Sequence, residues 1–201
     1  MSGLGVRPSP RPSQRPAAPF WLALVAASVS GPINAAAFPS VDWWPLIFLG
    51  TGLLMWSVAG RGIGGAIVLG VLGGFSFWGT HIFWLTIYLG PIPWLALAGL
   101  QTIFFAMGAV LLALAWRWVP MMWPGTWGRL VLLPAVLGAV WSLRESITST
   151  WPYGGFSWGR LSFSQSESPF GSLVAWFGVS GVSFLLAWLS AVLGQALRES
   201  D

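Results

Sequence analysis

Long apolar runs separated by short polar breaks dominate the chain from residue 20 to its end. Each run is close to the roughly 20 apolar residues that an α-helix needs to cross about 30 Å of hydrocarbon. The runs cover approximately residues 20–37, 44–60, 63–88, 94–116, 129–147 and 170–197. The pattern therefore predicts an all-α fold, a polytopic transmembrane helical bundle of about six spans.

The breaks and the glycines add detail to this prediction. Residues 119–128 are too short and too interrupted by proline to span, and their tryptophans suit a membrane–water interface. Two pairs of glycines have the spacing that lets transmembrane helices approach closely, Gly60 with Gly64 and Gly70 with Gly74. We expect these glycines to pack helices rather than to bind a ligand.

The chain begins with a different kind of sequence. Residues 1–19 are rich in arginine and proline and have no apolar periodicity, which predicts a disordered cytoplasmic tail. Residues 20–197 form the predicted bundle, and 198–201 a short cytoplasmic end. The basic start, the first apolar run and the triplet Ala35-Ala36-Ala37 also fit a cleaved signal peptide. The length of that run and the spans after it favour a first transmembrane helix.

Composition agrees with a membrane protein. The chain is 56% hydrophobic and only 7% charged, whereas soluble domains carry about 25% charged residues. Its mean hydropathy is +0.75. The arginines lie scattered between apolar runs, so the chain lacks the clustered basic surface that binds nucleic acid. The absence of cysteine excludes disulfides and thiolate metal sites within these 201 residues.

The arginines predict how the bundle is oriented. With a cytoplasmic N-terminus, two arginines fall outside, Arg144 and Arg160, and seven fall inside, at positions 7, 11, 15, 61, 117, 129 and 198. This distribution obeys the positive-inside rule. Both termini are therefore predicted to be cytoplasmic, with residues 148–169 forming an outer loop.

Ionisable groups within or near the predicted spans are the first candidates for function, because a charge there is costly. Three qualify: His81, Arg144 and Glu145. Adjacent helical residues point about 100° apart, so Arg144 and Glu145 should not face each other. We expect Glu145 either to bind Arg160, which would tie the outer loop to the helix end, or to contact a substrate.

His81 is the only histidine, and its neighbours do not form a recognisable hydrolytic triad. One histidine without nearby carboxylates also cannot supply the ligands of a metal site. We interpret His81 as a packed or interfacial residue and expect neither a metal nor another cofactor.

The outer loop, residues 148–169, holds the richest combination of aromatic residues and glycines in the chain. Glycines permit the unusual backbone of an interfacial or re-entrant segment, whose polar groups must be paired. Two interpretations remain: an aromatic belt that anchors the protein at the outer leaflet, or the wall of a cavity that faces lipid.

The loop and its surroundings contain a series of motifs, in chain order Phe38-Pro39, Trp43-Trp44-Pro45, Gly74-Phe75, Trp84, Glu145, Gly155-Phe156-Ser157-Trp158, Ser164-Gln165, Pro169 and Gly178-Val179. In their order and spacing these motifs resemble the membrane part of bacterial apolipoprotein N-acyltransferases. The resemblance covers most of the chain from about residue 20. Ser157 replaces the usual proline, and Arg144 precedes the glutamate where the family has a basic residue after it.

The resemblance implies a multi-pass protein of the bacterial cell membrane. The family transfers an acyl chain from a phospholipid to the N-terminal cysteine of a diacylated lipoprotein, using a Glu-Lys-Cys triad in a nitrilase-like domain. This chain has no cysteine and no lysine, so that domain would have to act in cis or in trans. We expect Trp84, Glu145, Phe156, Trp158 and Gln165 to line a lipid or substrate cavity or to position the loop.

Two other functions remain open. Some proteins of this family resemble partners of a polyprenyl-phosphate mannosyl synthase, so the bundle could be a non-catalytic scaffold or anchor for such a glycosyltransferase. The arginines of the tail and Arg198 would then offer its docking surface. A small transporter or channel is disfavoured by the lack of an intramembrane charge network.

Overall fold

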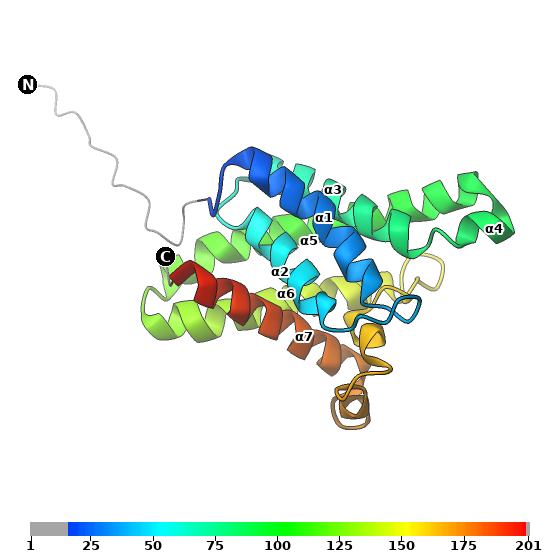
Figure 1. Cartoon of the computed structure of the whole chain (residues 1–201). Coiled ribbons are helices and arrows are strands. Elements are labelled where there is room, and N and C mark those ends of the chain that lie inside the picture. The colour runs from blue at the N-terminus through cyan, green and yellow to red at the C-terminus, as the bar shows by residue number, and fades with distance from the viewer. Residues whose placement is uncertain (1–15, 200–201) are drawn as a thin grey trace, which may run out of the picture.

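The structure, a computed structural model, describes residues 16–199, with side chains to residue 195, and every regular element in this range is helical. Figure 1 shows the helices side by side in one bundle. The seven α-helices of the described range are α1 (Phe20–Ala36), α2 (Leu46–Val58), α3 (Ile63–His81), α4 (Leu85–Leu89), α5 (Pro91–Met122), α6 (Leu133–Thr148) and α7 (Val174–Glu199).

The predicted all-α bundle is confirmed. Four segments are long and apolar enough to cross a membrane, namely Ile63–His81, Pro91–Met122, Gly128–Thr148 and Gly171–Gln195. The shorter α1 and α2 are apolar as well. These six segments correspond in order to the six predicted runs. The predicted disordered tail falls mainly on residues 1–15, which lie outside the described residues.

Two predicted boundaries are wrong. The third run does not continue to residue 88, because Ile82 leaves helical geometry at φ −106° and ψ 20° and ends α3 at His81. The short α4 follows after this turn. The next helix, α5, starts at Pro91, since a proline in the first turn loses no intrahelical hydrogen bond. It also continues to Met122, through part of the segment predicted to be broken.

Of the two glycine pairs predicted to pack helices, only Gly70 and Gly74 lie against another helix. A Cβ on Gly70 would lie 2.6 Å from the Cβ of Ala109, and one on Gly74 would lie 2.5 Å from the Cβ of Phe105. Both glycines therefore bring α3 directly against α5. Gly64, in contrast, has no atom within 4 Å of such a Cβ, and Gly60 adopts φ 70° in the turn between α2 and α3.

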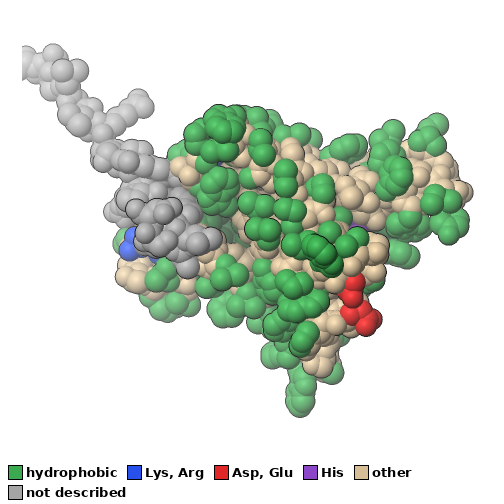
Figure 2. All heavy atoms as spheres, in the orientation of Figure 1, with side chains coloured by type: hydrophobic (Ala, Val, Ile, Leu, Met, Phe, Trp, Pro, Cys, Tyr) green, Lys and Arg blue, Asp and Glu red, His purple; other side chains and the backbone are tan. Residues whose placement is uncertain are grey.

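The two ends of the bundle differ in charge. The described ends of the chain lie at the same end of the bundle, and the loop between α6 and α7 lies at the other, with α4 (Figure 1). At the first end Arg61 donates a hydrogen bond to the carbonyl of Ala18. Acidic side chains gather near the loop, and apolar side chains cover much of the visible face (Figure 2). This asymmetry supports the predicted orientation, which remains a prediction.

Candidate functional site

The loop between α6 and α7 folds over one end of the bundle. It contains two 3-10 turns, Leu161–Gln165 and Gly171–Leu173. Gly154 and Gly155 adopt φ 90° and 80°, a conformation that favours glycine, and they reverse the chain after α6. The reversal lets the N–H of Phe156 donate to the carbonyl of Thr148 at 2.7 Å. The loop is therefore anchored to the end of α6.

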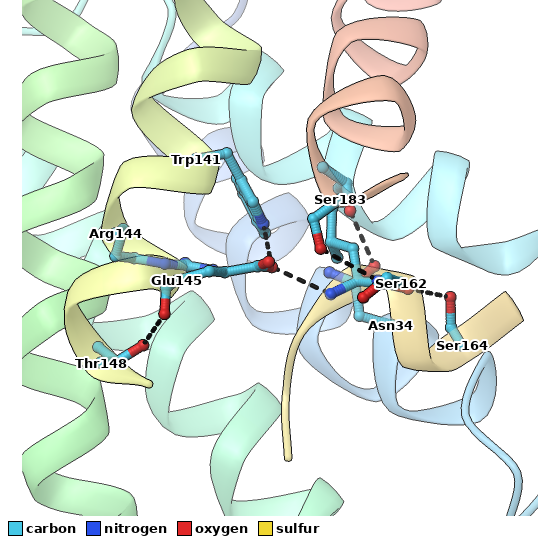
Figure 3. A network of polar contacts seen from close by, with 10 residues as sticks. Asn34, Trp141, Arg144, Glu145, Thr148, Ser162, Ser164 and Ser183 are labelled. Atoms are coloured by element: carbon cyan, nitrogen blue, oxygen red, sulfur yellow. Dashed lines mark hydrogen bonds and ion pairs between the residues drawn. The ribbon is translucent and has the colours of Figure 1, made fainter. Parts of the chain in front are cut away.

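Glu145 fastens the next part of the loop. Its Oε1 accepts hydrogen bonds from the Nε1 of Trp141 at 2.9 Å and from the backbone N–H of Leu161 at 3.0 Å (Figure 3). The expected partner, Arg160, donates instead to the Oγ of Ser180 on α7. Leu161 begins a 3-10 turn, and the first N–H groups of such a turn have no partner inside it. The carboxylate of Glu145 therefore pairs with a main-chain donor. The loop is tied to α6 as expected, but not by an ion pair.

Arg144 lies among aromatic rings. Its guanidinium carbon is 3.8 Å from the ring centroid of Phe105 and 4.2 Å from that of Trp141. The Nη2 of Arg144 lies 3.9 Å from the Oε1 of Glu145. The expectation that these two neighbours do not meet was wrong, because the long arginine side chain reaches back to the carboxylate. Two ring faces and one carboxylate thus stabilise a cation that is almost fully buried.

Three of the predicted residues meet through their rings. The centroids of Trp84 and Trp158 are 5.3 Å apart, and Phe156 stacks nearly parallel to Trp158 at 6.2 Å. Phe156 then contacts Trp78 of α3 at 5.6 Å. Trp158 is 56% exposed, whereas Phe156 is partly buried against the core. The series Trp84, Trp158, Phe156 and Trp78, which we call the aromatic path, leads from the surface into the bundle.

His81 contacts the loop, which the sequence did not predict. Its Nε2 lies 3.1 Å from the carbonyl oxygen of Trp158, and a carbonyl only accepts, so Nε2 carries the proton. The imidazole stacks on Phe77 at 5.1 Å and contacts Phe38 at 4.2 Å. The chain's one histidine, at the end of a long and mostly apolar run, was the available signal. His81 thus connects α3 to the loop at Trp158.

Replacing His81 by phenylalanine should loosen the loop. The ring contacts remain, but the hydrogen bond to Trp158 is lost. One such bond contributes about 0.5–1.5 kcal/mol, so amide exchange in residues 156–165 should become about 2- to 10-fold faster. Hydrogen–deuterium exchange with mass spectrometry measures this. His81→Gln, which keeps a donor, should change exchange less, and an equal increase in α5 would contradict the local role.

Gln165 lies apart from the aromatic path. Its Nε2 donates to the Oγ of Ser164 and its Oε1 accepts from the Oγ of Ser168, both at 2.8 Å. The side chain is fully buried inside the loop. Of the two roles expected for Gln165, this geometry fits loop positioning rather than cavity lining.

A small pocket lies beneath the loop. Its cavity volume is about 10 Å³, about the space of one water molecule, and its lining includes Trp78, Gln101, Arg144, Glu145, Phe156 and Arg160. Gln101 was not singled out from the sequence, although it is a polar residue in the middle of an apolar run. Among the described residues there is no group of three or more metal-binding side chains. The pocket combines charged and amide groups with aromatic walls.

A known protein family matches the region of the chain that contains these features. A family model for the apolipoprotein N-acyltransferase N-terminal domain matches residues 30–192. A protein named apolipoprotein N-acyltransferase from Haemophilus influenzae is 29% identical over 168 residues, which is 83% of this chain and 31% of that protein. The protein of the same name from Pasteurella multocida is 27% identical over 172 residues, 85% of this chain and 32% of its own length.

A third protein of that name, from Methylococcus capsulatus, is 32% identical over 135 residues, 65% of this chain and 26% of that protein. This chain therefore spans about a third of the length of the curated relatives it matches. The matched region contains the aromatic path, Glu145 and the loop.

Proposed function

Because this chain belongs to the apolipoprotein N-acyltransferase family, whose N-terminal membrane domain it contains, we propose that its loop and aromatic path guide phospholipid and lipoprotein substrates to an acyl-transfer site. The acyl chain passes from a phospholipid to the N-terminal cysteine of a diacylated lipoprotein. A nitrilase-like domain, in cis or in trans, performs the transfer. The bacterial cell membrane is its location.

The observation that supports this proposal is the aromatic path itself. Trp84 and Trp158 contact each other at the surface, at the end of the bundle where α4 and the loop lie. Indole rings favour the boundary between hydrocarbon and water, because they join a large apolar ring to one N–H donor. Phe156 continues from this pair into the lining of the pocket. A lipid chain at Trp158 therefore lies next to a polar pocket.

Trp158→Ala should reduce contact with lipid acyl chains at the loop. An aromatic contact contributes about 0.5–1.5 kcal/mol beyond its area, so crosslinking at residues 153–160 should fall about 2- to 10-fold. The full chain would be placed in nanodiscs that contain phospholipid with a diazirine on one acyl chain. Irradiation and peptide mass spectrometry then locate the crosslinks.

Trp127→Ala is the matched control, because Trp127 is 61% exposed and lies between α5 and α6, away from the loop. It should leave crosslinking at the loop unchanged. Equal crosslinking in the unaltered chain and in Trp158→Ala would contradict the proposed path. Phe156→Ala tests the inner part of the path in the same way.

The scaffold interpretation has less support. It depends on Arg7, Arg11, Arg15 and Arg198, whose side chains lie outside the described part of the structure. The contacts of the described residues converge on the loop instead. Copurification of a glycosyltransferase with the full chain, together with absent lipid crosslinking at the loop, would favour the scaffold.

A further inference from the structure

The pocket beneath the loop is lined by buried polar atoms. Four of them have no hydrogen-bond partner among the described residues, namely the Nε1 of Trp78, the Oε1 of Gln101, the Oε2 of Glu145 and the Nε of Arg160. All four side chains line the pocket. Trp78 lies on α3, Gln101 on α5 and Glu145 on α6, while Arg160 belongs to the loop. Buried polar groups in native proteins are nearly always paired, so these atoms require a shared partner.

The size of the pocket limits what this partner can be. The cavity volume is about 10 Å³, and a cavity needs about 10–15 Å³ by this measure to hold one water molecule. An acyl chain, a phosphate group or a peptide amide is too large for this space. The partner is therefore a single water molecule or a monatomic ion.

The four atoms favour water over an ion. Two are donors, on Trp78 and Arg160, and two are acceptors, on Gln101 and Glu145. Water donates two hydrogen bonds and accepts two. A cation would leave both donors unpaired and lie near the guanidinium of Arg144, whereas an anion would leave both acceptors unpaired and face the carboxylate of Glu145.

We propose that one ordered water molecule binds in this pocket and connects the loop to α5. The water accepts hydrogen bonds from the two donors and donates to the two acceptors. The loop is already bound to α6 through Glu145 and to α3 through His81. The water adds a third attachment, in which Gln101 positions the loop by acting through the water. This role goes beyond the proposed function, because it requires no substrate.

A structure of the full chain in nanodiscs, at a resolution that reveals ordered water, tests the site directly. We expect one density peak within about 2.5–3.2 Å of the four unpaired atoms, the normal range of hydrogen bonds. An empty pocket, or density too large for one water molecule, would overturn the proposal. Side chains that turn to pair with one another would overturn it as well.

Gln101→Leu tests the link in solution. Leucine has a similar size but offers no acceptor, so the water loses its partner on α5. Amide exchange in residues 161–165, measured by hydrogen–deuterium exchange with mass spectrometry, should become about 3- to 10-fold faster, the range for one lost hydrogen bond. Without the water, the substitution would only remove an unpaired acceptor, and exchange would not become faster. That outcome would contradict the proposal.

Arg160→Met completes a double-mutant cycle with Gln101→Leu. Both residues bind the same water in the proposal, so their effects on the loop are coupled. In the background of Arg160→Met, which also loses the hydrogen bond to Ser180, the substitution of Gln101 should accelerate exchange less than about 2-fold. An equal factor in both backgrounds would mean that the two residues act independently, and the link through water would be rejected.

Thr102→Val is the control. Thr102 is the buried neighbour of Gln101, and its hydroxyl donates to the carbonyl of Ala98. It is not among the residues that line the pocket. This variant should leave amide exchange in the loop unchanged. Acceleration by the same factor as in Gln101→Leu would indicate a general loosening of α5 and would count against the water.

Discussion

Glu145→Ala should destabilise the protein by about 3–5 kcal/mol, the cost of removing one partner from a buried ion pair. The substitution takes away the acceptor of both Trp141 and the backbone N–H of Leu161. It also leaves the buried guanidinium of Arg144 without its carboxylate. The loop should detach from α6 before the rest of the bundle unfolds. Unfolding in mixed micelles, followed by far-ultraviolet circular dichroism, measures the free energy.

Glu145→Gln separates the hydrogen bonds from the charge. Its carbonyl can still accept from Trp141 and Leu161, while Arg144 loses the negative charge. We expect a smaller loss, about 1.5–3 kcal/mol, the contribution of a hydrogen bond to a charged group. If the free energy of unfolding of Glu145→Ala lies within about 1 kcal/mol of that of the unaltered chain, the carboxylate does not hold the loop.

Gly70→Val should be the next most damaging substitution, with a loss of about 3 kcal/mol. The new Cβ would lie 2.6 Å from the Cβ of Ala109 and 2.7 Å from the Cα of Ala106. The second atom belongs to the backbone, so no side-chain rotation relieves the clash and α3 must move away from α5. Overpacking of this kind costs typically 1–3 kcal/mol, sometimes more. The same unfolding assay measures it.

Gly64→Val is the control on the same helix. Nothing lies within 4 Å of a Cβ at this position. We expect a change within about 0.5 kcal/mol. Similar losses in both variants would point to an effect of valine on helix formation, and not to the contact between α3 and α5.

Six of the seven α-helices of the described residues, and their order, could be predicted because long runs of apolar residues leave few alternatives in a membrane protein, whereas the short α4 was not predicted. The break at Ile82 could not be predicted, since residues 63–88 are predominantly apolar and contain no proline that would mark the end of a helix. The two glycine pairs show the same limit. Gly60 with Gly64 and Gly70 with Gly74 have identical spacing, and only the arrangement of α3 against α5 distinguishes them.

The candidate site was predictable in part. Trp84, Phe156 and Trp158 were chosen through a family resemblance, and the structure brings their rings together. The predicted partner of Glu145 was Arg160, and this prediction was wrong because it considered only charge pairing. The carboxylate instead accepts a hydrogen bond from the main-chain N–H of Leu161. Main-chain donors carry no sequence signal. Gln101 was missed because one amide in a long helix gives no indication of which face it occupies.

The buried face of α6 determines how this helix is rotated about its axis within the bundle. Trp141, Glu145 and Thr148 recur at spacings of four and three residues and are buried, while Leu143 and Ile147 on the other side are exposed. Rotation of α6 about its axis by one residue would move Arg144 to the exposed position of Leu143, or Glu145 to the position of Ser146. Either rotation would break the contacts of the pair and expose more of a charged group, which is costly in a membrane helix. The ion pair therefore favours one rotation of α6 about its own axis. An α6 made only of leucine and alanine would not have this preference.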